Sequence, residues 1–170
     1  MAIEIREPTE TEVAPIKKLY EIVTDELRRI YRPRSDTLDS TTTRTIQLGA
    51  FDGNLVLGAV QYHVLSDSLL LQGLAIDPQQ RRQGLARALV SSLEQQAKTL
   101  GKTFLELETV EETGNTPVFI ALGFKSLERY PATRVEGVNG GLVHIVRMQR
   151  QVKAKCCGYC LLYTSPSPRD

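Results

Sequence analysis

The sequence predicts an α/β (α+β) fold in a single domain, and three observations support this prediction. A helical pattern of apolar residues opens the chain, strand-like segments follow it, and a second long helical pattern comes after the third strand. The chain has 170 residues, 41% of them apolar and 24% charged, which is typical of a globular domain. We expect the domain to span residues 1–151, with residues 152–170 as a tail that is non-native or disordered.

The first helix is expected to begin at a cap provided by Thr9 or Thr11 and to end at Pro33. Apolar side chains recur in this segment at steps of three and four residues, which indicates one buried helix face. This stripe consists of Val13, Ile16, Leu19, Tyr20, Val23, Leu27 and Ile30. The polar segment 35–43 that follows has no periodicity and is expected to be a loop.

Strands are predicted wherever runs of β-branched and other apolar residues end at turn signals. The clearest case is a hairpin, in which the sequence Asp-Gly-Asn at 52–54 separates two strand-like runs. The expected strands are 45–51, 55–65, 69–76, 103–110, 124–130 and 142–149, with a short helix at 116–122.

A second long helix is predicted after the third strand, which ends at Asp77-Pro78. It is expected to run to Leu100, with Gly101 as the residue that terminates it. Its buried face repeats at steps of four residues and consists of Leu85, Leu89, Leu93 and Ala97, with Ala88 and Leu100 beside them.

The start of this helix is a candidate anion site. Amide groups of a first helical turn point outward and carry the positive end of the helix dipole. Gly84 and Ala86 add no bulk there, so a phosphate group could approach the backbone, and Arg81 and Arg82 add positive charge. The alternative is that Gly84 only eases the turn and the arginines are solvated. The glycine patterns of Rossmann and P-loop proteins are absent from this segment.

The sequence Arg81-x-x-Gly84-x-Ala86 resembles the (Gln/Arg)-x-x-Gly-x-(Gly/Ala) signature of the GCN5-related N-acetyltransferases (GNAT). The later segments 114–115 and 122–124, Gly-Asn and Leu-Gly-Phe, resemble a second part of the family pattern. The expected order of elements also resembles the family fold. The resemblance implies a mixed, mostly antiparallel central sheet with flanking helices and a splayed pair of parallel strands.

The resemblance further implies that acetyl-CoA is the co-substrate and binds in the gap between the splayed strands, without a metal. The pantetheine would lie along the edge of the third strand, and the pyrophosphate on the amides of the loop. The cofactor-binding residues implied in this way are Leu74, Ala75, Ile76, Arg81, Arg82, Gln83, Gly84, Leu85, Ala86, Arg87, Asn115 and Phe119.

The catalytic residues are less clear, because the sequence departs from the family pattern. Many relatives have a tyrosine acid at the position of Phe119, and a Glu or His base at the positions of Gln72 or Leu70. Glu108 and Glu106, on one face of the strand 103–110, are therefore the candidate bases, unless both are ordinary solvated residues. The sequence predicts an N-acetyltransferase acting on an amine-bearing acceptor, with a non-catalytic acyl-CoA-binding or sensing module as the alternative.

Charge and composition exclude other partners. The net charge is +1, so we expect no nucleic acid partner, and no apolar run is long enough to cross a membrane. We expect a cytoplasmic monomer or homodimer. All three cysteines lie within 156–160, and residues 160–170, CLLYTSPSPRD, resemble a translated sequencing adapter. No metal site is expected, because the C-x-x-C there has no second pair of ligands.

Overall fold

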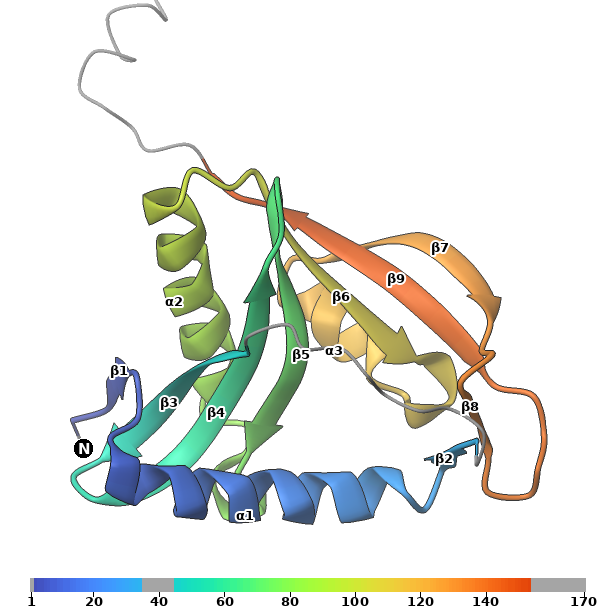
Figure 1. The fold of residues 1–170 in the computed structure, drawn as a ribbon, viewed down its shortest axis with the longest axis horizontal. Coiled ribbons are helices and arrows are strands. Elements are labelled where there is room, and N and C mark those ends of the chain that lie inside the picture. The colour runs from blue at the N-terminus through green and yellow to red at the C-terminus, as the bar shows by residue number, and fades with distance from the viewer. Residues whose placement is uncertain (1, 35–44, 154–170) are drawn as a thin grey trace, which may run out of the picture.

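The computed structural model describes residues 2–34 and 45–153. The described chain combines strands with helices, and two short 3₁₀ helices, η1 and η2, follow β5 and β6 (Figure 1). In chain order the elements are β1 (Glu4–Arg6), α1 (Glu10–Leu27), β2 (Tyr31–Pro33), β3 (Ile46–Asp52), β4 (Leu55–Val64), β5 (Ser68–Ile76), η1 (Pro78–Gln80), α2 (Leu85–Thr99), β6 (Phe104–Val110), η2 (Glu111–Thr113), α3 (Thr116–Ala121), β7 (Lys125–Pro131), β8 (Val135–Gly137) and β9 (His144–Gln151).

The described strands form a seven-stranded sheet in the order β1-β3-β4-β5-β6-β9-β7 and a two-stranded sheet of β2 and β8. Neighbours in the large sheet are antiparallel except for β5 and β6, which are parallel. This mixed, mostly antiparallel sheet with one parallel pair confirms the predicted fold class.

The parallel pair separates after four residues. Ser68–Leu71 of β5 pairs with Phe104–Leu107 of β6, and no pairing continues beyond these segments. The register with β4 shifts at the same place, since Leu71 lies opposite Tyr62 and Gly73 lies opposite Gln61. Gln72 is therefore the extra residue of a β-bulge, which bends a strand. Figure 1 shows the result: β5 and β6 meet at one end and diverge toward the other.

Helices α1 and α2 pack on different groups of sheet residues. The buried side chain of Ile16 in α1 forms a small hydrophobic cluster with Phe51 and Ala59. The α2 stripe of Leu85, Leu89, Leu93 and Ala97 is buried, as expected from its four-residue repeat, and belongs to the main core. This core fixes the strand that precedes the loop and the helix that follows it, so the loop between them has two rigid ends.

Several expectations for α1 and its surroundings were wrong. The helix ends at Leu27 with Arg28 as its C-cap, and Pro33 lies in β2 instead of terminating the helix. Val13 is 50% exposed, so the buried stripe is narrower than the sequence pattern suggested. Strands β1, β2 and β8 were not expected, because three residues are too few to show a period of two.

One expectation for α2 also differs, and hydrogen bonds extend beyond the end of β9. Leu100, expected beside the buried face of α2, is 46% exposed. Beyond β9, the Val152 N–H donates to the Thr103 carbonyl oxygen (2.8 Å) and the Lys153 N–H donates to Glu94 Oε1 (3.1 Å). Val152 and Lys153 therefore also contact the domain through their backbones. The loop at 35–43, the cysteines and the tail from 154 lie outside the described residues.

None of the helices in residues 2–34 and 45–153 combines the length and the hydropathy of a membrane-spanning segment.

Candidate active site

Two cavities lie in the gap where β5 and β6 diverge. The first, which we call the strand cavity, has a volume of about 520 Å³ and is lined by β5, β6 and the small sheet. The second, the loop cavity, has a volume of about 610 Å³ and is lined by the loop before α2, the start of α2, α3 and the end of α1. Both cavities are lined by Leu27, Leu74, Thr113, Asn115 and Phe119. The two cavities therefore adjoin each other at these shared residues.

The loop cavity contains most of the residues implied by the resemblance. Leu74, Ile76, Arg81, Arg82, Gly84, Leu85, Ala86, Arg87, Asn115 and Phe119 line it. Gln83 and Ala75 do not, and the side chain of Ala75 is buried in the core. Past Leu71 the edge of β5 that faces the gap has no strand partner among the described residues, a feature that suits an added strand-like ligand. The Gly73 carbonyl oxygen in this segment accepts a hydrogen bond from the Tyr20 hydroxyl (3.3 Å).

The backbone of the loop is held in an uncommon conformation. Arg82 has a φ of 64° and Gly84 a φ of 82°, both in the left-handed region. An L side chain at 84 would be strained, although a β-carbon there would meet no atom within 4 Å. The glycine is therefore required by the turn, and the space beside it is open to a ligand such as a phosphate group.

The amides at the start of α2 precede its hydrogen-bond ladder. The bond from the Ala88 N–H to the Gly84 carbonyl oxygen (3.0 Å) is the first of the helix, so the N–H groups of residues 85–87 have no acceptor within it. Arg81 forms an ion pair with Glu26 of α1 (2.7 Å), and Arg87 donates to the Ala121 carbonyl oxygen (3.2 Å). The two arginines thereby connect the loop to α1 and α3.

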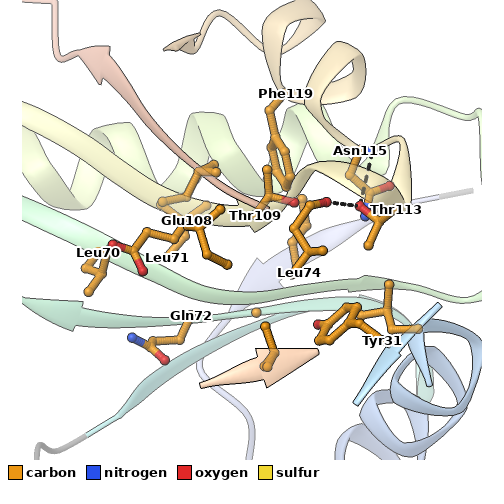
Figure 2. A pocket seen from close by; sticks show the side chains of 16 residues that line it. Tyr31, Leu70, Leu71, Gln72, Leu74, Glu108, Thr109, Thr113, Asn115 and Phe119 are labelled. Carbon is orange, nitrogen blue, oxygen red and sulfur yellow. Dashed lines mark hydrogen bonds between the residues drawn. The ribbon is translucent and has the colours of Figure 1, made fainter. Parts of the chain in front are cut away.

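Asn115 and Phe119 stand on the opposite side of the gap from β5 (Figure 2). The Thr113 hydroxyl donates to the Val110 carbonyl oxygen (2.6 Å) and accepts from the Asn115 N–H (3.3 Å). The Phe119 ring packs edge-on against Phe124, with centroids 6.1 Å apart. These contacts fix the start of α3 relative to the end of β6.

Glu108 lines the strand cavity and is held by a residue that the sequence did not indicate. The Tyr130 hydroxyl donates to Glu108 Oε1 at 2.8 Å. Burial and the neighbouring carboxylate raise the pKa of Tyr130 to about 12, so its phenol stays protonated at neutral pH. Glu108 is thus a carboxylate in the gap with a fixed hydrogen-bond donor.

Glu106 lies on the same strand in a different environment and lines neither cavity. It accepts hydrogen bonds from Ser68 (2.9 Å), Arg147 (3.2 Å) and Gln149 (3.2 Å). Burial acts to raise the pKa of Glu106, but the bonds from Ser68, Gln149 and Arg147 outweigh it and the pKa is lowered. A carboxylate satisfied in this way is a structural ion and a weak base.

The remaining walls of the strand cavity include Tyr31, Val135 and Ile145. They come from β2, β8 and β9, and β2 lies about a hundred residues before the other two strands. Gln72 and Leu70, the positions at which relatives often have a base, do line this cavity.

The arginines near the end of α1 lie outside the site. Of these, Arg32 pairs with Glu136 (3.1 Å). None of Arg28, Arg29, Arg32 and Arg34 lines either cavity.

An open backbone edge, a helix N-terminus and the carboxylate of Glu108 surround the gap between β5 and β6. The sequence model of the acetyltransferase (GNAT) family matches residues 13–124, and the chain belongs to this family. GNAT enzymes use acetyl-CoA as co-substrate. A comparison with curated proteins gave no match.

Solved structures resemble the chain over nearly its whole described length. A GCN5-related N-acetyltransferase from Kribbella flavida has a TM-score of 0.68 at 17% identity, covering 88% of this chain and 98% of that one. The structure of yncA from Salmonella typhimurium with its cofactor acetyl-CoA has a TM-score of 0.67 at 18% identity, covering 92% and 98%. The ribosomal-protein-S18-alanine N-acetyltransferase from Escherichia coli has a TM-score of 0.63 at 18% identity, covering 92% and 99%. At these identities the likeness concerns the fold.

Proposed function

We propose that this protein is an N-acetyltransferase that transfers the acetyl group of acetyl-CoA to a primary amine of a small molecule, a protein or a peptide. The observation that carries the proposal is that the two cavities adjoin at Leu74, Asn115 and Phe119, which line both. One cavity ends on the amides of α2, which suit a pyrophosphate. The other contains the carboxylate of Glu108, which suits an amine.

In the proposed complex, coenzyme A occupies the loop cavity. The pyrophosphate lies on the N–H groups of residues 82–87, and the pantetheine extends along Leu74, Ala75 and Ile76 as an added strand. Ala75 contributes only its backbone, because its side chain is buried. Asn115 and Phe119 face the pantetheine from the other side of the gap, which directs the thioester toward the strand cavity.

The reaction needs a neutral amine, since an ammonium group has no lone pair for attack. The amine nitrogen attacks the thioester carbonyl carbon, a C–N bond forms, and the C–S bond breaks as the thiolate leaves. We assign to Glu108 the removal of the amine's proton, directly or through water. Glu106, the other candidate base, is assigned the structural role that its three hydrogen bonds support.

The thiolate of coenzyme A has no acid at position 119, because phenylalanine offers no hydroxyl. Thr113 already donates its proton to the Val110 carbonyl oxygen, and Tyr130 donates to Glu108. We therefore propose that the thiolate leaves unassisted and takes its proton from water. A thiolate is a fair leaving group at neutral pH, so this step needs no strong acid.

The missing acid also keeps a second candidate function in view, an acyl-CoA-binding or sensing module that does not catalyse transfer. One experiment separates the two. Purified protein is titrated with acetyl-CoA by calorimetry and then assayed against a panel of primary amines, with release of free thiol as the readout. Amine-dependent thiol release supports the enzyme. Binding of acetyl-CoA without thiol release for any amine supports the sensing module.

A cytoplasmic location and a monomeric or homodimeric state remain predictions.

A further inference from the structure

The strand cavity has a charge pattern that restricts the acceptor. Among the described residues that line it, Glu108 is the only one with a charged side chain. No arginine or lysine in the described ranges reaches the lining. Arg147 lies opposite Glu108 in the pairing of β6 with β9, but its guanidinium is bonded to Glu106 at 3.2 Å.

Another part of the cavity wall is apolar and packed against a buried core. Tyr31, Val135 and Ile145 are partly buried and pack against a small core of Val110, Ala132 and Val143. Burial raises the pKa of Tyr31, so this phenol is an uncharged part of the wall. Because the wall belongs to a packed core, we expect it to hold its shape when an acceptor binds.

This pattern has consequences for each class of amine. A single ammonium group can pair with Glu108, which can then take up the proton that the amine must lose to become a nucleophile. A second cation on the acceptor would lose its hydration without finding a second carboxylate. A carboxylate beside the amine, as in an amino acid, would face Glu108 and find no cation in the lining.

We propose that the acceptor is a small primary monoamine with an alkyl or arylalkyl body, whose nitrogen lies at Glu108 and whose body lies on Tyr31, Val135 and Ile145. This inference rests on the proposed acetyltransferase function and narrows its acceptor. Diamines, amino acids and peptide N-termini are the alternatives that the test must be able to favour.

The test uses matched pairs of acceptors with the whole chain and acetyl-CoA. Propylamine is compared with propane-1,3-diamine, which adds one cation, and 2-phenylethylamine with phenylalanine, which adds one carboxylate. We expect kcat/KM for the monoamine to exceed that for its partner by at least about tenfold in each pair. Equal values, or a preference for the diamine, the amino acid or a short peptide, would overturn the inference and leave the enzyme function standing. If acetyl-CoA binds but no amine releases thiol, both proposals fail.

A variant locates the effect in the cavity. Val135→Glu adds a carboxylate to the apolar wall, and Val135→Gln is the uncharged control of the same size. We expect the Glu variant to raise the ratio of kcat/KM for propane-1,3-diamine over propylamine at least about fivefold relative to the Gln variant. Using a ratio cancels the intrinsic reactivity of the two amines. If the Glu variant binds acetyl-CoA but its ratio of kcat/KM values equals that of the Gln variant, the proposed position of the acceptor on Val135 is wrong. If the Glu variant does not bind acetyl-CoA, the comparison of matched acceptors with the wild-type protein decides whether the inference stands.

Discussion

The loop cavity and the strand cavity meet at the same residues but are built in different ways. The loop cavity depends on backbone amides supplied by one continuous segment, Gln80–Arg87, between a buried strand and a buried helix. The strand cavity depends on side chains from β2, β5, β6, β8 and β9. One end can therefore recognise a constant group through the main chain, while the other can change its acceptor by exchanging single side chains.

The largest expected effect belongs to the backbone site. Gly84→Glu places bulk and a negative charge where the pyrophosphate would lie, in a residue with a φ of 82°. We expect acetyl-CoA affinity to fall by about a hundredfold or more, or about 3 kcal/mol, measured by calorimetry. Gly101→Glu is a matched control, because Gly101 also has a positive φ (69°) and open space beside it, at the far end of α2. Equal losses of acetyl-CoA affinity in the two variants would attribute the loss to backbone strain and would contradict the proposed pyrophosphate site at Gly84.

Glu108→Gln tests the side-chain site. We expect kcat/KM for amines to fall by about tenfold, with acetyl-CoA affinity unchanged. The rise of rate with pH should be smaller than in the wild type, because the variant has no carboxylate to accept the amine's proton. An unaltered profile would end the assignment of Glu108 as the base and leave Glu106 or solvent to remove the proton.

Tyr130→Phe tests whether Glu108 needs its donor. The phenol has its pKa raised to about 12, so it stays protonated and donates to Glu108 throughout an assay between pH 7 and pH 10. Removing it should lower kcat by about threefold, since one hydrogen bond that orients the carboxylate is lost. In a Glu108→Gln background the same change should have little further effect. Full additivity of the two changes would show that Tyr130 acts independently of Glu108.

Glu106→Gln should separate stability from catalysis on the same strand. The folded state lowers the pKa of Glu106, so its contribution to stability is present above the pKa of the unfolded chain and is lost as pH falls through the lowered value. We expect Tm to drop by about 2–4 °C at pH 7. The difference from wild type should shrink as pH falls through the lowered pKa of Glu106, while the pH–rate profile stays that of the wild type. A pH-rate profile that changes instead would return Glu106 to the catalytic candidates.

Sequence reasoning reached the loop cavity because that site is local. The turn, the glycine and the helix start are contiguous, so their chemistry is visible within a few residues of Arg81. The same holds for α2, whose buried stripe repeats at a fixed interval. Where two segments that are distant in the sequence come into contact only in the fold, the sequence contains no comparable pattern.

The contact between Tyr130 and Glu108 shows the difficulty. β9 lies between β6 and β7, so two residues 22 positions apart meet across a strand that comes later in the chain. Tyr31 and Val135 likewise reach the cavity through strands of three residues, too short for a periodic pattern. The acceptor end of the site depends on such pairings, which is why the sequence identified the cofactor more readily than the acceptor.

The smallest expected effect concerns Phe119, which both cavities share. Phe119→Tyr restores the hydroxyl that many relatives have, and on the family resemblance it would point toward the sulfur of coenzyme A. The Phe119 ring is held edge-on by Phe124, so the phenol should keep this direction. We expect turnover to rise by no more than about twofold, because proton transfer contributes to the rate only where departure of the thiolate is limiting. Single-turnover release of free thiol measures this step directly. A gain of tenfold or more would show that departure of the thiolate limits the wild-type enzyme, and that the junction of the two cavities restricts the rate more than the acceptor end does.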